Sequence, residues 1–205
     1  MVRFIALVTA FTLLLLNIAF AQEKPNIVKA FSESYSYENS ADYTKAIESI
    51  KKVYAADSYE MNLRLGWLYY LAKDYKDSET YYTKAITIMP LSIEARLGYA
   101  YPAYALGNKE AVIRKYKEII TVDPYNYYAN YRLGALYYEM GDFINAKKHL
   151  DKVINYYPFD YDGIIMSAWT NYRLNKLREA KVLFNKALLN RPNDASALEG
   201  LSLIK

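Results

Sequence analysis

The stretch YYANYRLGALYYEMGDFINAKKHLDKVINYYP, residues 127–158, decides the fold of this 205-residue chain. Its apolar residues recur at helical spacing in two blocks, one around Leu133 and Tyr137 and one around Ala146 and Leu150. The pair Gly141-Asp142 separates the two blocks, and the second block ends at a proline, which cannot continue a helix. The stretch therefore predicts two helices joined by a tight turn.

The closing proline recurs at a fixed interval, because Pro90, Pro124, Pro158 and Pro192 each stand 34 residues from the next. Self-similarity at such a period is typical of repeat architectures. The fourth unit carries a Leu-Gly pair and a tyrosine in its first helix, then a turn glycine, an aromatic residue, an alanine, a bulky apolar residue and the proline, and the other units match parts of this template. This pattern resembles the tetratricopeptide repeat. The resemblance implies an all-α fold, a right-handed α-solenoid of about five helix hairpins.

We expect the repeats over residues 25–58, 59–90, 91–124, 127–158 and 161–192, followed by a capping helix over residues 194–204. The first repeat lacks the proline, as a capping repeat can. The third has Pro102 inside its first helix, and its Leu-Gly pair stands two residues farther from the closing proline than in the second or fourth repeat. We align the third repeat on this Leu-Gly pair and expect a kink near Pro102.

Residues 1–21 form a segment of another kind. After a short basic start, Phe4 to Phe20 is almost entirely apolar and ends in Ala19-Phe20-Ala21, a small-x-small pattern. This predicts a secretory signal peptide cleaved after Ala21, a tetratricopeptide-repeat domain over residues 22–205, and export to the periplasm or the exterior. The alternative is a retained membrane anchor, because the run approaches the roughly 20 apolar residues that cross a bilayer.

Composition argues against several classes of function. The chain has no cysteine, one histidine and a net charge of only +4, with no basic block, so we expect no disulfide and no nucleic-acid partner. It also lacks a glycine-rich phosphate loop and His or carboxylate residues at metal spacing. We therefore expect no enzyme activity and no catalytic, metal or cofactor site. We assign His149, beside Lys147 and Lys148, to the solvated face of its helix.

The family resemblance implies where a partner would bind. In this family the first helices of successive hairpins line a concave groove that usually holds a peptide. Matching positions here carry many aromatic residues, which often dominate interface energetics: Trp67, Tyr70, Tyr99, Tyr128, Tyr131, Tyr138, Trp169 and Tyr172. By contrast, we assign Tyr82 and Tyr116 to the core.

One triplet repeats beside these aromatic residues. Arg64, Arg96 and Arg132 each precede a Leu-Gly pair in three consecutive hairpins, which predicts a ladder of arginines along the groove. Arginine binds carboxylates through paired hydrogen bonds and stacks on rings. The expected partner is therefore a protein or peptide segment rich in acidic or aromatic residues.

These observations favour a non-catalytic adaptor or scaffold of the cell envelope that binds a peptide segment in its groove. Two alternatives stay open. A carbohydrate-binding module could stack sugars on the groove aromatics, although neutral glycans give no role to the arginines. A structural subunit could self-associate through its terminal helices, although residues 194–204 show a single apolar stripe, enough to cap the stack.

Overall fold

A computed structural model describes residues 26–204, so the predicted signal peptide lies outside the described residues. Every regular element in this range is a helix, which confirms the expected all-α class. No helix between residues 26 and 204 has the length and apolar character needed to cross a membrane. The contacts divide the chain into two compact units, and the boundary between them lies after Ala55 in the sequence. The smaller unit contains one hairpin, α2 (Ile27–Asn39) and α3 (Tyr43–Lys51).

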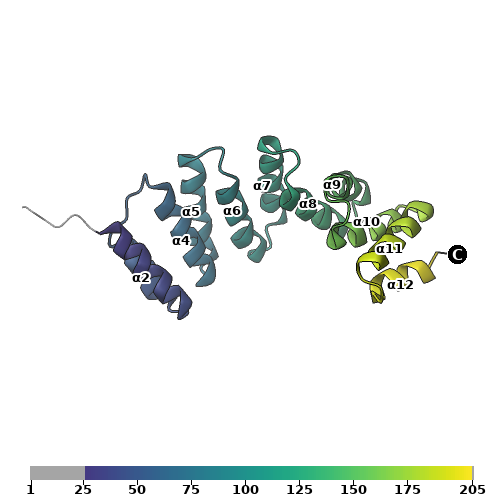
Figure 1. Cartoon of the computed structure of the whole chain (residues 1–205). Coiled ribbons are helices and arrows are strands. Elements are labelled where there is room, and N and C mark those ends of the chain that lie inside the picture. The colour runs from purple at the N-terminus through teal and green to yellow at the C-terminus, as the bar shows by residue number, and fades with distance from the viewer. Residues whose placement is uncertain (1–25, 205) are drawn as a thin grey trace, which may run out of the picture. The chain divides into compact units, whose positions relative to one another are not determined.

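The larger unit consists of four hairpins and a terminal helix, following one another along the chain from blue to yellow in Figure 1. We call α4, α6, α8, α10 and α12 the first helices and the others the second helices. The predicted α-solenoid is thus present in this unit. The bounds are α4 (Tyr59–Leu71) with α5 (Tyr75–Ile88), α6 (Ile93–Ala105) with α7 (Lys109–Val122), α8 (Tyr127–Glu139) with α9 (Phe143–Tyr156), α10 (Tyr161–Arg173) with α11 (Leu177–Asn190), and α12 (Ala195–Ser202).

The repeat period is set where each first helix begins. In all five cases the capping side chain accepts a hydrogen bond from the backbone N–H three residues later, which satisfies a donor that the helix leaves unpaired. The caps stand 34 residues apart, so α12 starts in the register of a further repeat. They are Ser58, Ser92, Asn126, Asp160 and Asp194.

This register corrects our alignment of the third repeat. Helix α6 begins at Ile93, 34 residues after the first residue of α4, and continues through Pro102. Arg96 is therefore the fourth residue of its helix, whereas Arg64 and Arg132 are the sixth residues of theirs. Aligning on the Leu-Gly pair was wrong because the capping residue determines where a helix starts. A Leu-Gly pair contributes only to packing and can stand at different positions along the helix.

Tyrosine hydroxyls connect successive first helices at their beginnings. The hydroxyls of Tyr59 and Ser92 lie 2.8 Å apart, and the Tyr161 hydroxyl donates to Asp194 at 2.6 Å. Tyr127 donates to the next capping residue in the same way, at 3.1 Å. Because each tyrosine reaches the cap of the following repeat, these bonds help to hold neighbouring hairpins in register.

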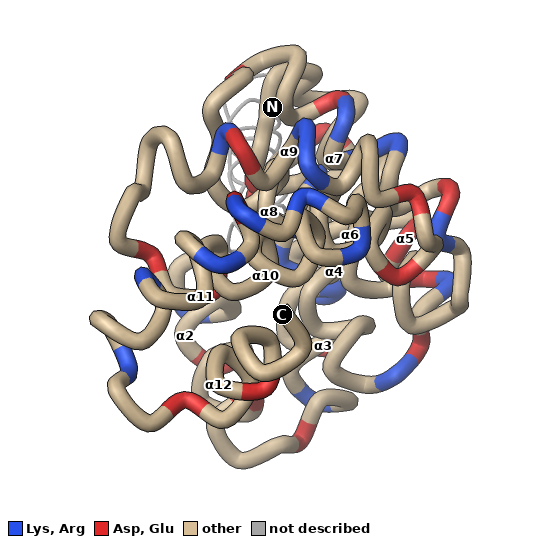
Figure 2. The backbone as a smooth tube through the Cα atoms, turned by 90° about the vertical axis from the view of Figure 1, so that its right-hand side faces the viewer, with Lys and Arg blue, Asp and Glu red and all other residues tan. Residues whose placement is uncertain are grey.

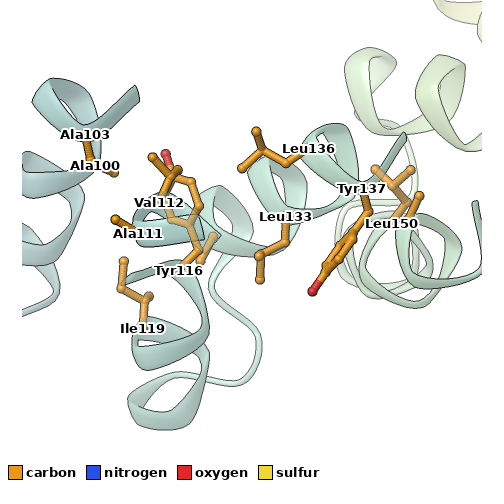
Figure 3. Close-up of a cluster of buried hydrophobic side chains, with 12 residues drawn as sticks. Ala100, Ala103, Ala111, Val112, Tyr116, Ile119, Leu133, Leu136, Tyr137 and Leu150 are labelled. Carbon is orange, nitrogen blue, oxygen red and sulfur yellow. The ribbon is translucent and has the colours of Figure 1, made fainter. Parts of the chain in front are cut away.

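The central core of the larger unit joins α6, α7, α8 and α9 (Figure 3). Ala100 and Ala103 face the second helix α7, whose Val112 and Tyr116 lie between α6 and α8. Leu133 and Leu150 bring α8 against α9, and both are fully buried. Burying apolar area of this kind, at about 25 cal/mol per Å², is the main source of stability in a fold with no disulfide.

His149 belongs to this packing, and our assignment to a solvated face was wrong. Its side chain is only 5% exposed, and its ring stacks on Tyr137 at 5.8 Å. Its Nδ1 lies 3.1 Å from Oδ1 of Asn130, whose amide nitrogen already donates to two carbonyls. His149 Nδ1 is thus the donor, and burial lowers the pKa of His149 to about 4.

Candidate functional site

The first helices are not evenly spaced in the larger unit. Helix α4 packs on α6, and α10 packs on both α8 and α12, whereas α6 and α8 stand farther apart. Two of the close pairs share a glycine as sixth residue of the later helix. A Cβ on Gly98 would lie 2.2 Å from Cε1 of Tyr82, and one on Gly200 would lie 2.2 Å from Cζ of Phe184. The missing side chain lets a ring of the preceding hairpin sit against the helix backbone.

Between α6 and α8 the same position holds an arginine. Arg132 and Tyr116 both line this junction, and Tyr116 occupies the place of Tyr82 and Phe184 in its own second helix. An arginine needs more room than a glycine, and a cavity of about 210 Å³ lies here. Its polar groups come from Tyr70 of α4, Tyr101 and Tyr104 of α6, Tyr116 of α7, and Arg132 and Glu139 of α8.

Aromatic rings form one wall of the cavity. The Tyr101 ring lies 5.5 Å from that of Tyr70 and meets the edge of Trp67 at 6.3 Å. Trp67 and Tyr70 lie one helical turn apart on α4, with their rings at 5.6 Å. Tyr101 is the ninth residue of its helix, as Trp67 is in α4, and Tyr104 matches Tyr70. We missed both residues of α6 because our register was two residues out, and the Ser92 cap would have revealed them.

One guanidinium and a neighbouring phenol also interact at the cavity. Arg132 Nη2 donates to the Tyr128 hydroxyl at 3.3 Å, and the guanidinium lies 5.3 Å from the centre of that ring. Arg132 lowers the pKa of Tyr128, whereas a hydrogen bond to Tyr128 raises the pKa of Tyr101. Burial raises the pKa of Tyr116 to about 12. At neutral pH the Tyr116 phenol is therefore neutral, and the guanidinium of Arg132 supplies a positive charge beside it.

The rim of the cavity carries a negative charge, the Glu139 carboxylate, which is neutralised by an ion pair. Glu139 accepts a hydrogen bond from Lys109 at 3.1 Å, so its carboxylate is already paired. Arg132 has no carboxylate partner among the described residues. Its guanidinium has five N–H donors, and the bond to Tyr128 uses only one of them. The remaining donors can bind an acceptor on a ligand.

Of the predicted site residues, Trp67, Tyr70, Tyr128 and Arg132 gather at or beside this cavity. Two others on α8 do not line it. Tyr131 stacks on Tyr127 at 6.0 Å, and Tyr138 meets the edge of Phe143 at 5.3 Å.

The two site residues predicted on α10 lie at the other end of the unit. The Trp169 indole donates to Ser196 of α12 at 2.8 Å, and its ring packs edge-on against Phe184 at 5.0 Å. Tyr172 meets the edge of the same indole at 5.7 Å. Trp169 therefore contacts the chain's own terminal helix and does not join the cavity.

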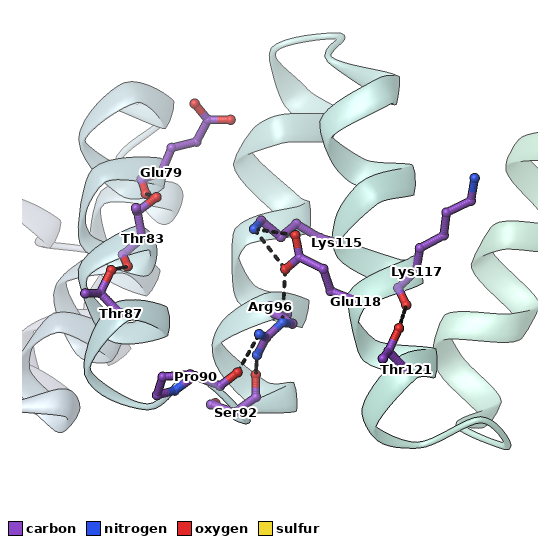
Figure 4. Close-up of polar contacts among 10 residues, drawn as sticks. All are labelled: Glu79, Thr83, Thr87, Pro90, Ser92, Arg96, Lys115, Lys117, Glu118 and Thr121. Carbon is purple, nitrogen blue, oxygen red and sulfur yellow. Dashed lines mark hydrogen bonds and ion pairs between the residues drawn. The ribbon is translucent and has the colours of Figure 1, made fainter.

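Arg96 does not face the groove. It is buried, and it donates to the carbonyls of Pro90 and Ser92 and to Glu118 (Figure 4). Asn62 and Asn130, the fourth residues of α4 and α8, donate to the two carbonyls at the matching positions of their own repeats. A buried side chain at this position thus satisfies the inter-repeat turn, whether it is an asparagine or an arginine.

The ladder of arginines is consequently absent. Arg64 is buried, Arg96 supports a turn, and only Arg132 is exposed. Tyr99 also does not line the cavity, and Nζ of Lys115 of α7 lies over its ring, 5.3 Å from the centre. Both misplaced residues of α6 follow from the same register error.

No concentrated charge marks another site in the part of the chain that the structure describes. Basic and acidic residues are interspersed along its helices (Figure 2). No three His, Asp or Glu side chains between residues 26 and 204 gather as metal ligands would.

Comparison with known sequences identifies the repeat. Models described as tetratricopeptide repeat match residues 31–93 and 128–160. A TPR repeat-containing protein of Methanocaldococcus jannaschii is 29% identical over 139 residues. The alignment covers 65% of this chain and 24% of that protein, so the chain spans about a quarter of its length.

Solved structures share the fold. A tetratricopeptide repeat protein from Parabacteroides merdae has a TM-score of 0.74 at 20% identity, over 87% of this chain and 72% of its own. MamA has a TM-score of 0.71 at 23% identity, covering 82% and 93%. YrrB, described as a TPR protein with an unusual peptide-binding site, has a TM-score of 0.71 at 13% identity, covering 91% and 97%. The chain is thus an α-solenoid of the tetratricopeptide-repeat fold, with repeats of that family recognised by sequence over residues 31–93 and 128–160.

Proposed function

We propose that this chain is a non-catalytic adaptor or scaffold that binds a peptide segment of another protein on the face made by its first helices. The cavity between α6 and α8 carries the proposal, because it combines about 210 Å³ of space, an aromatic wall and an available guanidinium. Rigid aromatic side chains offer large contact area at little entropic cost. The comparisons agree with this proposal, since YrrB, which shares the fold, is described as having a peptide-binding site.

The chemistry of the cavity suggests what the segment carries. The Tyr70, Tyr101 and Tyr116 rings suit an apolar or aromatic side chain, whose burial there excludes water. The free donors of Arg132 suit a carboxylate, which a guanidinium can bind through two parallel hydrogen bonds. A neutral glycan would use the rings but leave the charge without a partner. The site therefore favours an acidic peptide with an aromatic or apolar anchor.

We also propose that the protein is exported, and that its partner is a protein of the cell envelope. The apolar run from Phe4 to Phe20 followed by Ala19-Phe20-Ala21 supports this proposal. The mass of the protein purified from its native cells tests it. A mature chain beginning at Gln22 is expected, whereas an intact N-terminus in the soluble cell fraction would contradict export.

The binding site can be tested with short random peptides displayed on phage and selected on the purified protein. Substitution Tyr70→Ala or Arg132→Gln should weaken the selected peptides about 30-fold in a fluorescence titration, the effect of a hot spot worth about 2 kcal/mol. Tyr172→Ala is the matched control, because Tyr172 is the twelfth residue of its helix, as Tyr70 is, but lies outside the cavity. Equal binding by all three variants would place the site elsewhere.

A further inference from the structure

The ninth residue of the first helix carries an aromatic ring in three of the four hairpins of the larger unit. It is Trp67 in α4, Tyr101 in α6 and Trp169 in α10. In α8 the ninth residue is Ala135, which lines the cavity between α6 and α8. The one hairpin of this unit that lacks the ring therefore lies at the open junction.

Where it is present, the ring at the ninth position packs against other rings. Trp67 lies 5.6 Å from Tyr70 and meets the edge of Tyr101 at 6.3 Å. Trp169 meets the edge of Phe184 at 5.0 Å. Rings whose centres lie roughly 4.5–7 Å apart attract one another beyond the effect of their burial. The repeat thus places an aromatic side chain at this position where other rings can contact it.

The space beside Ala135 is large enough for one ring. The cavity of about 210 Å³ exceeds the roughly 150 Å³ that holds a benzene molecule in a protein interior. Among the residues that line it, Ala100, Val112 and Leu136 are nearly fully buried (Figure 3). A ring that reaches these side chains loses its contact with water, which stabilises the bound state.

Tyrosine rings also border this space on the side of α4 and α6. Tyr70 and Tyr101 lie 5.5 Å apart, and both line the cavity together with Tyr104. An aromatic occupant would form edge and face contacts with these rings, whereas an aliphatic side chain of the same size would not. The cavity therefore favours an aromatic occupant over an aliphatic one.

The positive charge beside this space limits what flanks the ring. Arg132 precedes Ala135 by three residues, so the two lie on the same face of α8 with Cβ atoms about 5–6 Å apart. An extended chain advances about 3.3 Å per residue. A carboxylate one or two residues from the aromatic residue can therefore reach the N–H donors of Arg132 that Tyr128 leaves available.

Given the peptide binding proposed above, we propose that an aromatic side chain of the bound segment takes the place of the ring that α8 lacks at Ala135. An Asp or Glu one or two residues away along the segment binds Arg132. Ala135 is then the residue that determines specificity, because its small side chain leaves the space and the rings of α4 and α6 select an aromatic occupant. The ring of the partner completes the row that the repeat leaves incomplete at α8.

The substitution Ala135→Phe fills this space with a ring of the chain's own. The test uses phage-displayed peptides that are selected on the full chain and whose binding depends on Tyr70 and Arg132. They should bind Ala135→Phe at least about 30-fold more weakly, because their own ring no longer fits. Ile144→Phe is the matched control, since it adds the same ring at a 75% exposed site of the same hairpin and should leave the affinity unchanged.

Measurements on the unaltered chain make the test independent of how the variant folds. The selected peptides should carry a Phe, Tyr or Trp with an Asp or Glu within two residues. Replacing that aromatic residue with alanine should weaken binding about 30-fold, and replacing it with cyclohexylalanine about two- to tenfold. Phenylacetate, which has a ring and a carboxylate, should compete with the peptide more strongly than cyclohexylacetate does.

Three results would overturn this proposal and leave the proposed function intact. The first is full affinity of the selected peptides for Ala135→Phe. The second is a set of peptides that depend on Tyr70 and Arg132 but contain no aromatic residue, or no acidic residue near it. The third is equal binding of the aromatic and cyclohexylalanine peptides. If no peptide depends on Tyr70 or Arg132, the cavity is not the binding site, and both proposals are wrong.

Discussion

The closed and open junctions of the larger unit differ at one position. Gly98 and Gly200 let α6 and α12 rest on an aromatic ring of the preceding hairpin, and the first helices there pack closely. Arg132 occupies the same position in α8, and α6 and α8 stand apart around the cavity. The third close junction, between α8 and α10, has Met166 at this position, so what sets the open junction apart is the arginine.

The two tryptophans sharpen the same contrast. Trp67 and Trp169 are both the ninth residue of a first helix, so sequence alone treats them as equivalent. Trp67 joins the aromatic cluster with Tyr70 and Tyr101, whereas Trp169 is bonded to Ser196 at the closed junction. Whether a tryptophan at this position lies in the groove or packs against a helix therefore depends on the neighbouring helix, and not on the residue itself.

The largest effect is expected from disturbing a closed junction. Gly200→Val would place Cβ 2.2 Å from Cζ of the fully buried Phe184, so α12 must shift. We expect a loss of about 3 kcal/mol in the free energy of unfolding, measured by urea titration. In a Trp67→Phe background, the emission of Trp169 should also move to longer wavelength. Leu198→Val, at an exposed site of the same helix, is the control, and equal effects of the two substitutions would contradict the close fit.

The converse experiment converts the open junction into a closed one. Arg132→Gly puts a glycine at the position that Gly98 holds in α6, and removes the cation of the cavity. We expect about 30-fold weaker binding of peptides selected at the cavity, and about 1 kcal/mol less stability from glycine in a helix. Arg132→Met, which copies Met166 of α10, removes the charge but keeps the bulk. Identical affinities of the Gly and Met variants would show that the charge matters and the spacing does not.

Acid should affect the open junction before the closed ones. His149 is the chain's only histidine, and it supports α8 through Asn130. Its folded pKa of about 4 lies below the unfolded value near 6.5, so its contribution to stability is complete above pH 6.5 and declines as the pH falls toward 4. We expect a loss of roughly 2 kcal/mol between pH 7 and pH 5. Urea titrations at both pH values measure it, and His149→Gln should remove most of the difference.

Hydrogen exchange locates the acid effect. Amides of α8 and α9 should lose protection at pH 5 relative to those of α10 and α11, after correction for the intrinsic pH dependence of exchange. Uniform loss of protection across the larger unit would contradict a local role for His149.

The hairpins, their turns and the C-terminal helix were predictable because the same local sequence signals recur along the repeats. These signals are a proline turn, a capping residue and two apolar blocks. Half of the site was not. In α6 the Leu-Gly pair and the Ser92 cap disagreed by two residues, and only the cap has the backbone hydrogen bond that starts a helix. The contacts of Trp169 and the burial of His149 depend on packing against α12 and α8, which local patterns do not encode.

The smallest expected effect compares the two tryptophans directly. Trp169→Phe keeps most of the ring but removes the indole N–H that donates to Ser196 across the closed junction. A net hydrogen bond contributes about 1 kcal/mol, so Trp169→Phe should lower the free energy of unfolding by about that amount. A double-mutant cycle that combines Trp169→Phe with Ser196→Ala measures the coupling free energy between these two residues. A coupling free energy near zero would mean that the hydrogen bond is not a significant part of the junction. Trp67→Phe, the matched substitution at the open junction, should act mainly on peptide affinity, because its ring faces the cluster around the cavity.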